Sequence, residues 1–388
     1  MGKHFLIVVA ITIWLAQSVR ADVWSFQGLG DLTGGPFQSA AFDVSDDATA
    51  VVGNGVTTVD TKAFRWTQNG GMIQLENSSY FSHSSGISAD GSVAVGWIWD
   101  RATATVEAFR WTAAGGAVGL GDLPGGTFES YANDVSADGD VIVGQGQSNS
   151  GYEAMRWSEA GGMVGLGDLP GGITHSAAFG VSRDGSVVVG EANSASGHEA
   201  FLWTSGTGMI GLGDLPGGTF DSHAEDVLAD GNVVVGYGNS GLGREAFRWT
   251  LGGGMVGLDD LPGGTFDSAA WGGTADGSII VGSGNTGIGR EAFIWDSANG
   301  MRNLKNVLTS ERGVDLAGWT LTYALAMSPT GDAIVGWGLN PSGQQEAWLV
   351  HVVPEPSAFV LAMVGLAGIA WFCRRHRSNT RATSSGVR

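Results

Sequence analysis

Short apolar runs alternate with glycine-rich turns along most of the chain, and two phrases mark the repeat. One phrase ends in Val-Gly, as at Val143-Gly144, and the other reads Glu-Ala-Phe-x-Trp with small changes. The alanine of the second phrase recurs at spacings of 45 or 46 residues, and the last spacing is 55, with copies at 63, 108, 154, 200, 246, 292 and 347. Each phrase occurs seven times, which predicts seven copies of one structural unit.

Four strands are predicted in each unit, and the third unit gives them clearly at 131–136, 140–144, 153–158 and 163–169. Asp138-Gly139 forms the first turn, because Asp can bond its own backbone and Gly accepts a positive φ. Gly161-Gly162 is a second tight-turn signal. Val141, Ile142 and Val143 are apolar in succession, which predicts a strand that is covered on both faces.

A period near 46 residues is typical of a four-stranded propeller blade and is too long for one coil of a β-helix. The chain starts with an additional strand at 23–32, and its last unit stops after a third strand at 346–351. The N-terminal strand can therefore complete the last unit. We predict an all-β, seven-bladed β-propeller over residues 22–353, its ring closed by that strand. A solenoid with capping repeats is the alternative.

Two features of the repeats have structural interpretations. A tryptophan ends the third strand of six units, at 66, 111, 157, 203, 249 and 295. We predict that these rings pack between neighbouring blades rather than hold a sugar or a cofactor. The last unit contains an insertion at 303–316, for which a short helix is predicted.

The N-terminal segment has the features of a secretory signal over residues 1–21. Lys3 gives a positive start, residues 5–16 are mostly apolar, and Val19-Arg20-Ala21 ends the segment like a cleavage site. We therefore predict export and removal by signal peptidase. The alternative is an uncleaved anchor, for which the apolar run is short.

The C-terminal segment joins three features in order: Pro354-Glu355-Pro356, an apolar run at 358–373, and the basic pair Arg374-Arg375. The run is at the short limit for a transmembrane helix, and the arginines behind it would stay in the cytoplasm. A basic, polar tail follows at 378–388. We predict that this helix holds the chain in the inner membrane during export, and a plain single-span anchor is the alternative.

Residues 354–377 resemble the PEP-CTERM sorting signal of Gram-negative bacteria in motif, apolar helix and basic end. The resemblance implies an exosortase as processing partner and removal of the helix. It also implies delivery to the cell surface or the extracellular matrix.

The repeats resemble the HAF extracellular repeats of bacteria over residues 24–350. The matching phrases are EAFRW, GGMVGLGDLPGG and the DVSADG core. Where the family phrase starts with His, this chain has Lys62 in the first unit and Glu in the other six, at 107, 153, 199, 245, 291 and 346. The resemblance implies an extracytoplasmic repeat protein, and it provides no catalytic residues.

Charge and composition exclude several classes of function. Residues 22–353 hold 12 Lys and Arg against 37 Asp and Glu, a net charge of about −25, which disfavours nucleic-acid binding. Cys373 is the only cysteine, and the seven histidines lack zinc-site spacing. We predict no cofactor, no metal site and no catalytic residues. Calcium at the Asp-x-Ser-x-Asp-Gly turns is an alternative to a plain turn role for these aspartates.

The loops that enter each unit repeat an aromatic residue beside a polar or acidic one. An aromatic face packs on sugar C–H groups, and a carboxylate accepts hydrogen bonds from hydroxyls. We therefore predict a ligand-binding face for extracellular polysaccharide, although each Phe could instead pack inward to hold its loop. The candidate residues are Phe37, Phe128, Glu129, Phe220, Asp221, Phe266 and Asp267.

The predicted function is that of an exported, non-catalytic repeat protein with a structural or ligand-binding role at the cell surface or in the matrix. The alternative is an extracytoplasmic hydrolase or lyase that acts on glycans through paired carboxylates.

Overall fold

The computed structural model describes residues 23–76, 81–228 and 231–353. Residues Trp24–His351 form one compact unit. The predicted signal segment 1–21, the Pro354-Glu355-Pro356 motif, the helix at 358–373 and the tail at 378–388 lie outside the described residues. Within the described part of the chain, no helix is long and apolar enough to span a membrane.

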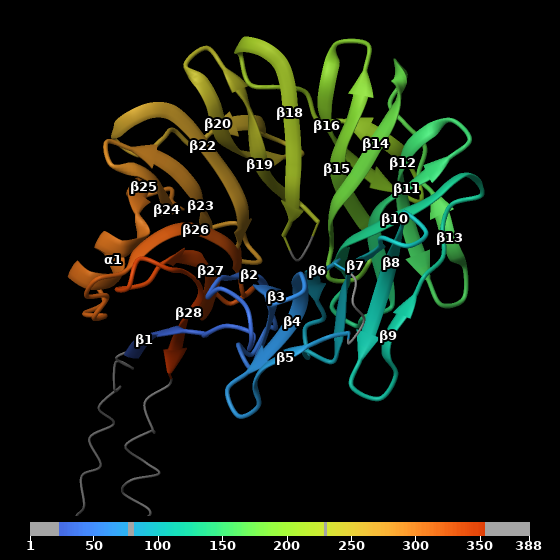
Figure 1. The fold of residues 1–388 in the computed structure, drawn as a ribbon. Helices are drawn as coiled ribbons and strands as arrows, with labels where there is room; N and C mark the ends of the chain where they lie inside the picture. The colour runs from blue at the N-terminus through green and yellow to red at the C-terminus, as the bar shows by residue number, and fades with distance from the viewer. Residues whose placement is uncertain (1–22, 77–80, 229–230, 354–388) are drawn as a thin grey trace, which may run out of the picture. The chain divides into compact units, whose positions relative to one another are not determined.

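The strands of the compact unit fall into seven groups of four antiparallel strands, labelled a to d here (Figure 1). The a strands are β2 (Ser39–Val44), β6 (Phe81–Ile87), β10 (Gly125–Val135), β14 (Gly171–Val181), β18 (Gly217–Val227), β22 (Gly263–Gly273) and β26 (Thr320–Met327). The b strands are β3 (Ala50–Val56), β7 (Val93–Asp100), β11 (Val141–Ser148), β15 (Val187–Ser194), β19 (Val233–Ser240), β23 (Ile279–Thr286) and β27 (Ala333–Leu339).

The c strands are β4 (Thr61–Thr67), β8 (Thr105–Thr112), β12 (Gly151–Ser158), β16 (Gly197–Thr204), β20 (Gly243–Thr250), β24 (Gly289–Asp296) and β28 (Gln345–Val353). The d strands are β5 (Gly71–Gln74), β9 (Gly116–Gly119), β13 (Gly162–Gly165), β17 (Gly208–Gly211), β21 (Gly254–Gly257), β25 (Gly300–Asn303) and, in the seventh group, β1 (Val23–Gly28). The insertion of the last unit contains the short helix α1 (Leu304–Ser310), as predicted.

The a and d strands differ in length from their predicted bounds. β10 starts at Gly125 instead of residue 131, because its glycine-rich start pairs with Ser148 across a register shift. β13 stops at Gly165 instead of residue 169, because Gly167 takes a φ of +82° and turns the chain. The predicted Asp-Gly turn is present: Asp138 Oδ1 accepts hydrogen bonds from Ser136 Oγ at 2.6 Å and Asp140 N at 3.0 Å.

One inter-group hydrogen bond recurs along the chain. The amide of the Glu-Ala-Phe alanine donates to a serine hydroxyl on the next a strand, as from Ala108 to Ser130 at 3.0 Å. Ala347 of the seventh group donates to Ser39 of the first in the same way, at 3.0 Å. The same bond joins Ala63 to Ser82, Ala154 to Ser176, Ala200 to Ser222 and Ala246 to Ser268.

The strand β1 makes the contacts that d strands make elsewhere. Its neighbour in the sheet is β28, and Leu29 N donates to Ala347 O at 2.8 Å. Glu346 Oε1 accepts from Gly30 N at 3.0 Å, just as Glu107 Oε1 accepts from Gly121 N at 3.2 Å. Glu153 and Glu199 make the same contact, so these glutamates hold the Gly-Leu-Gly-Asp loops after β1, β9, β13 and β17.

The apolar core is divided into clusters that lie between neighbouring groups. The repeated tryptophans pack in or against these clusters, as predicted, and the phenylalanine two residues earlier is more deeply buried. Phe64 has no exposed surface, whereas Trp66 is 7% exposed and Trp203 is half-buried. Phe64 lies opposite Gly53, where a Cβ atom would come within 2.8 Å of its ring. In every repeat a Cβ at this glycine would also come within 2.1 Å of a carbonyl oxygen of the a strand, so the Val-Gly phrase makes room chiefly for the a-strand backbone.

Candidate functional site

The predicted loop-face phenylalanines differ in exposure. Phe37 and Phe128 are 37% and 46% exposed, whereas Phe220 and Phe266 are half-buried. They come from four different groups and precede or start the a strands. Phe266 also lines a surface pocket of about 500 Å³. The binding role of this face stays a prediction.

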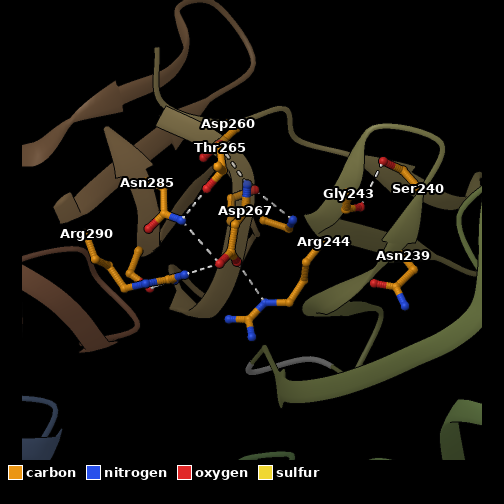
Figure 2. Close-up of polar contacts among 12 residues, drawn as sticks. Asn239, Ser240, Gly243, Arg244, Asp260, Thr265, Asp267, Asn285 and Arg290 are labelled. Atoms are coloured by element: carbon orange, nitrogen blue, oxygen red, sulfur yellow. Dashed lines mark hydrogen bonds and ion pairs between the residues drawn. The ribbon is translucent and has the colours of Figure 1, made fainter. Parts of the chain in front are cut away.

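The acidic partners on the same face are engaged by neighbouring side chains. Glu129 accepts a hydrogen bond from Tyr131 Oη at 2.7 Å, and Asp221 lies 2.9 Å from His223 Nε2. Figure 2 shows Asp267 between two arginines, with Arg244 Nε at 3.2 Å from Oδ1 and Arg290 bound to Oδ2. These carboxylates are therefore less available to sugar hydroxyls than the sequence predicted.

A central cavity, which the sequence did not predict, has a volume of about 430 Å³. Inward-facing side chains of the a strands line most of it. The lining residues are Phe42, Asp43, His83, Ser85, Asn133, Asp134, Phe179, Glu225, Asp226, Trp271, Tyr323, Leu325, Ala326 and Trp337. We call this space the central cavity, and it is the candidate functional site.

Three aspartates of the central cavity come from alternate groups, the first, third and fifth. Asp43 accepts hydrogen bonds from its neighbour Val44 N at 2.7 Å and from Ile87 N of the next group at 2.8 Å. Asp134 accepts in the same way from Val135 N and from Val181 N of the next group. Each of these two aspartates thus links its group to the following one.

Glycine occupies the equivalent position in the second, fourth and sixth groups. A Cβ at Gly86 would come within 3.1 Å of Asp134 Cα, and a Cβ at Gly180 within 3.0 Å of Asp226 Cα. Such distances are shorter than a side chain tolerates without displacement of backbone. This alternation of Asp and Gly is visible in the sequence. It occurs at the residue that precedes the last residue of most a strands, such as Asp134 before Val135.

Burial raises the pKa of every carboxyl in the central cavity. The pKa of Asp43 is raised to about 7 and that of Asp226 to about 6, chiefly by loss of hydration. The pKa of Asp134 is also raised, by burial and then by repulsion from the other two aspartates. The pKa of Glu225 is raised to about 7, again mainly by burial. Asp43 and Glu225 are therefore partly protonated near neutral pH.

Aromatic rings form much of the remaining wall. Tyr323 and Trp337 stack with their centroids 4.7 Å apart, and Phe42 lies 4.8 Å from the ring of His83. Burial lowers the pKa of His83 to about 4, so its ring is neutral at pH 7. Trp271 Nε1 donates to Ser283 Oγ at 3.3 Å, which fixes the orientation of its ring. The cavity therefore combines flat apolar faces with carboxyl and amide groups.

The a–b turns surround the other end of this space, where a smaller cavity of about 110 Å³ lies. Arg183 of the fourth group donates to both oxygens of Asp46 in the first, with Nη1 at 2.7 Å from Oδ1. Backbone bonds also connect successive groups here, from Asp46 N to Ala89 O, Ala89 N to Ala137 O and Ala137 N to Arg183 O, each at 3.0 Å. The positive charge of Arg183 is thus already neutralised by a partner.

The chemistry available at the central cavity is polar and aromatic. Among the described residues, no group of three or more His, Cys, Asp or Glu side chains is arranged to hold a metal ion. The pair Glu225 and Asp226 belongs to one group alone, so it departs from the repeat pattern. Ring faces beside carboxyls suit ligands that present C–H surfaces with hydroxyl or amino groups.

Residues 352–375 match the PEP-CTERM protein-sorting motif. The match includes Pro354, Glu355, Pro356, Arg374 and Arg375, so the predicted sorting motif is confirmed. It implies that the chain is exported and is an exosortase-sorted protein of the cell envelope. No curated protein matches the chain in sequence.

Solved structures show that the fold is propeller-like. The β-propeller domain of the Trilobed protease from Pyrococcus furiosus, reported with an open velcro topology, is 10% identical, with a TM-score of 0.53 over 81% of this chain and 92% of that one. An oligogalacturonate lyase in complex with manganese is 12% identical, with a TM-score of 0.51 over 85% and 97%. An oligogalacturonate lyase from Vibrio parahaemolyticus is 11% identical, with a TM-score of 0.50 over 86% and 98%. At such identity the likeness concerns the fold alone.

Proposed function

We propose that this chain is a non-catalytic carbohydrate-binding protein of the cell surface or extracellular matrix. After export, signal peptidase would remove residues 1–21 and an exosortase would process the C-terminal motif. The repeats would have the HAF type, and the ligand would be extracellular polysaccharide of the producing cell.

The proposal includes a closed ring of seven blades, each corresponding to one group of strands. Its support is that the seventh and first groups meet through Ala347 and Ser39, by the bond that joins consecutive groups elsewhere. A closed ring leaves no exposed sheet edge between its ends. It also surrounds the central cavity with all seven a strands.

One observation carries the binding proposal: ring faces and polar side chains share a single concave site. Trp271 and Tyr323 line the central cavity together with Asn133 and Glu225. Concave sites with a few polar groups among apolar walls are the usual form of small-ligand sites. The predicted loop face lies at the N-terminal ends of the same a strands. A polysaccharide on that face could insert one residue into the cavity.

A glycan-acting hydrolase or lyase is the second candidate, and the pKa values in the cavity favour it. Glu225 and Asp226 have pKa values raised to about 7 and about 6, and active-site acids are often shifted in this way. We rank binding first because the aspartates Asp43 and Asp134 already accept two backbone hydrogen bonds each. Those bonds give them a structural role.

The test uses the purified full-length protein and the exopolysaccharide of the producing organism. Binding is measured by co-sedimentation, and product release is measured by a reducing-end assay. We expect binding without shortening of the polymer. Replacement of Phe128, Phe220 and Phe266 together by Ala should weaken binding by about tenfold if the loop face takes part. Release of shorter products would favour the glycan-acting enzyme over the binding protein. Unchanged binding by a folded triple variant would contradict a binding role for the loop face.

A further inference from the structure

We infer that the central cavity selects a protonated amine, so that its ligand is a glycan with free amino groups. This inference rests on the proposed carbohydrate binding and specifies which class of sugar the cavity accepts. Its basis is the set of carboxyls in the cavity wall, the absence of a hydrogen bond to the Glu225 carboxyl among the described residues, and the rings beside it.

The lining contains four carboxyls whose pKa values are raised by burial, so a bound cation would favour their ionised forms. Asp43, Asp134, Glu225 and Asp226 contribute four carboxyls, and the described residues that line the cavity include no Lys or Arg. His83 is neutral at pH 7 because burial lowers its pKa to about 4. A cation inside the cavity would therefore meet attraction without a competing positive side chain in the wall.

The nearby arginines are held by other carboxylates. Arg183 binds both oxygens of Asp46 at the turn end. Arg244 and Arg290 both pair with Asp267, as the dashed lines of Figure 2 show. Each guanidinium thus has an anionic partner outside the lining. Among the described residues no ion pair reaches the four cavity carboxyls, and attraction from His223 and Arg244 acts on Glu225 at longer range.

Glu225 is the residue that the fold explains least. Among the described residues, no hydrogen bond to its carboxyl is present, in contrast to Asp43 and Asp134. Its equivalents in the other groups are Phe42, Ser85, Asn133, Phe179, Trp271 and Leu325. An acid is therefore not required at this position for the strand to form. Glu225 is half-buried, and a carboxyl that loses hydration without gaining a hydrogen bond costs free energy, which a cationic ligand would offset.

The aromatic wall distinguishes an organic cation from a bare ion. Trp271 occupies the position equivalent to Glu225 on the next a strand, and Tyr323 and Trp337 continue the wall. Ammonium groups bind over such rings, and sugar rings pack their C–H faces on them. A metal ion would need several ligands in close geometry, and no such group exists among the described residues.

A protonated amino sugar satisfies all three features at once. Its ammonium would pair with Glu225 and Asp226, its ring would pack on Trp271, and its hydroxyls would reach Asn133 and Ser85. A volume of about 430 Å³ is within the range of small-ligand sites and is sufficient for a terminal or looped sugar unit.

The experiment compares two tetrasaccharides with the same sugar backbone, a β-1,4-glucosamine tetramer and its fully N-acetylated form, in which each ionisable amine is replaced by a neutral acetamide. Binding to the full-length protein is followed by isothermal titration calorimetry at pH 7 and low salt. We expect the amine form to bind at least about tenfold more tightly, as is usual for a charge-assisted contact. Spermidine, a cation without a sugar ring, should bind more weakly than the amine tetramer.

Glu225→Gln tests the residue, and Glu159→Gln is the matched control, because Glu159 is exposed on a c–d turn. We expect Glu225→Gln to abolish most of the preference for the amine form, while Glu159→Gln leaves it unchanged. The thermal midpoint of each variant establishes that it is folded. Trp271→Ala should weaken binding of both tetramers.

Three outcomes would overturn the inference. Equal affinity for the two tetramers would contradict the selection of an amine but would be consistent with carbohydrate binding. Failure of both tetramers to bind, while the exopolysaccharide of the producing cell still binds, would exclude the cavity as an amino-sugar site. Spermidine binding as tight as that of the amine tetramer, insensitive to Trp271→Ala, would indicate general attraction of cations. If the wild-type protein does not bind the exopolysaccharide of the producing cell, the proposed function itself is contradicted.

Discussion

Arg183 and Asp46 form a two-hydrogen-bond ion pair between the fourth and the first groups of strands, although 137 residues separate them in sequence. Both side chains are about one-third exposed. The pair connects groups that are not consecutive along the chain. It therefore ties opposite parts of the repeat array at the end where the a–b turns meet.

Removing this pair should lower stability modestly. We expect Arg183→Ala to cost about 1 kcal/mol, because solvent screens a partly exposed pair even when its geometry is bidentate. Arg183→Lys should recover only part of this, since an ammonium cannot make both bonds at once. Urea unfolding of the two single variants and the double variant with Asp46→Ala gives the coupling energy. A coupling energy near zero would show that the pair contributes nothing.

The Ser39 hydroxyl should contribute as much to the free energy of unfolding as the equivalent serine hydroxyls between the other groups. Ser39→Ala leaves the buried amide of Ala347 without an acceptor, which should cost about 1–3 kcal/mol in the free energy of unfolding. Ser130→Ala, which removes the same bond between the second and third groups, is the matched control. If Ser130→Ala is costly and Ser39→Ala is silent, the junction of the last and first groups does not contribute to stability.

The buried phenylalanine should be more important than the tryptophan of the same phrase. Phe201 has no exposed surface, so Phe201→Ala should cost about 3–5 kcal/mol through lost burial and the cavity left behind. Trp203→Ala, at a half-buried position, should cost less. Thermal and chemical unfolding of both variants measures the difference, and the reverse order would contradict the packing described here.

Stability should fall as the pH rises from about 5 to 8. The folded-state pKa values of Asp43, Asp226 and Glu225 are raised to about 7, 6 and 7, so the folded protein binds more protons than the unfolded chain in this range. Their favourable contribution is complete below the unfolded pKa values near 4 and is lost as the pH passes the folded ones. Thermal midpoints across this range measure the slope.

The charged groups near these carboxyls either lose their stabilising contribution as the pH rises or keep the same charge throughout this pH range. Glu225 is faced by His223 and Asp226 of its own strand, by Glu191 of β15 and by Arg244 of β20. Asp43 is faced by Asp226 and Asp46. The pKa of His223 is raised by its pairing with Glu191 despite burial, so its contribution also disappears as the pH rises. Glu225→Gln should flatten the slope, and an unchanged slope would assign it to other groups.

The turn aspartates should show the opposite dependence. Hydrogen bonds from Ser278 and Thr274 lower the pKa of Asp276 to about 2. Its contribution is present above the unfolded pKa near 4 and is lost as the pH falls through 2. Asp276→Ala should therefore cost about 1 kcal/mol at pH 7 and much less near pH 2. An equal cost at both pH values would exclude the charged form as the cause.

The repeated features of the chain were predictable because each has a local cause. The Asp138-Gly139 turn, the four strands of a unit and the helix after residue 303 follow from turn chemistry and apolar pattern. The role of the additional N-terminal strand was predictable because the seventh unit stops after its third strand and lacks a fourth. The sorting motif was predictable because its three parts stand in a fixed order.

The central cavity could not be predicted from strand alternation. In β10 the register shifts between Ala132 and Asp134, and both Asn133 and Asp134 line the cavity. A two-residue period assigns successive residues to opposite faces, so it cannot place such a pair on one side. The same holds for Glu225 and Asp226. The pKa shifts depend on seven strands meeting at one place, which no single repeat specifies.

The pairing of β1 with β28 also determines when folding can finish. Ser25 on the first strand lies 3.1 Å from His351 on the last, so the sheet that contains them needs both extremities of the repeat region. A chain that crosses a membrane from its N-terminus must therefore keep β1 without its native partner until residue 351 has followed. Only two residues then separate that point from Pro354. The strand pairing that completes the repeat region therefore requires almost the whole chain up to the sorting motif.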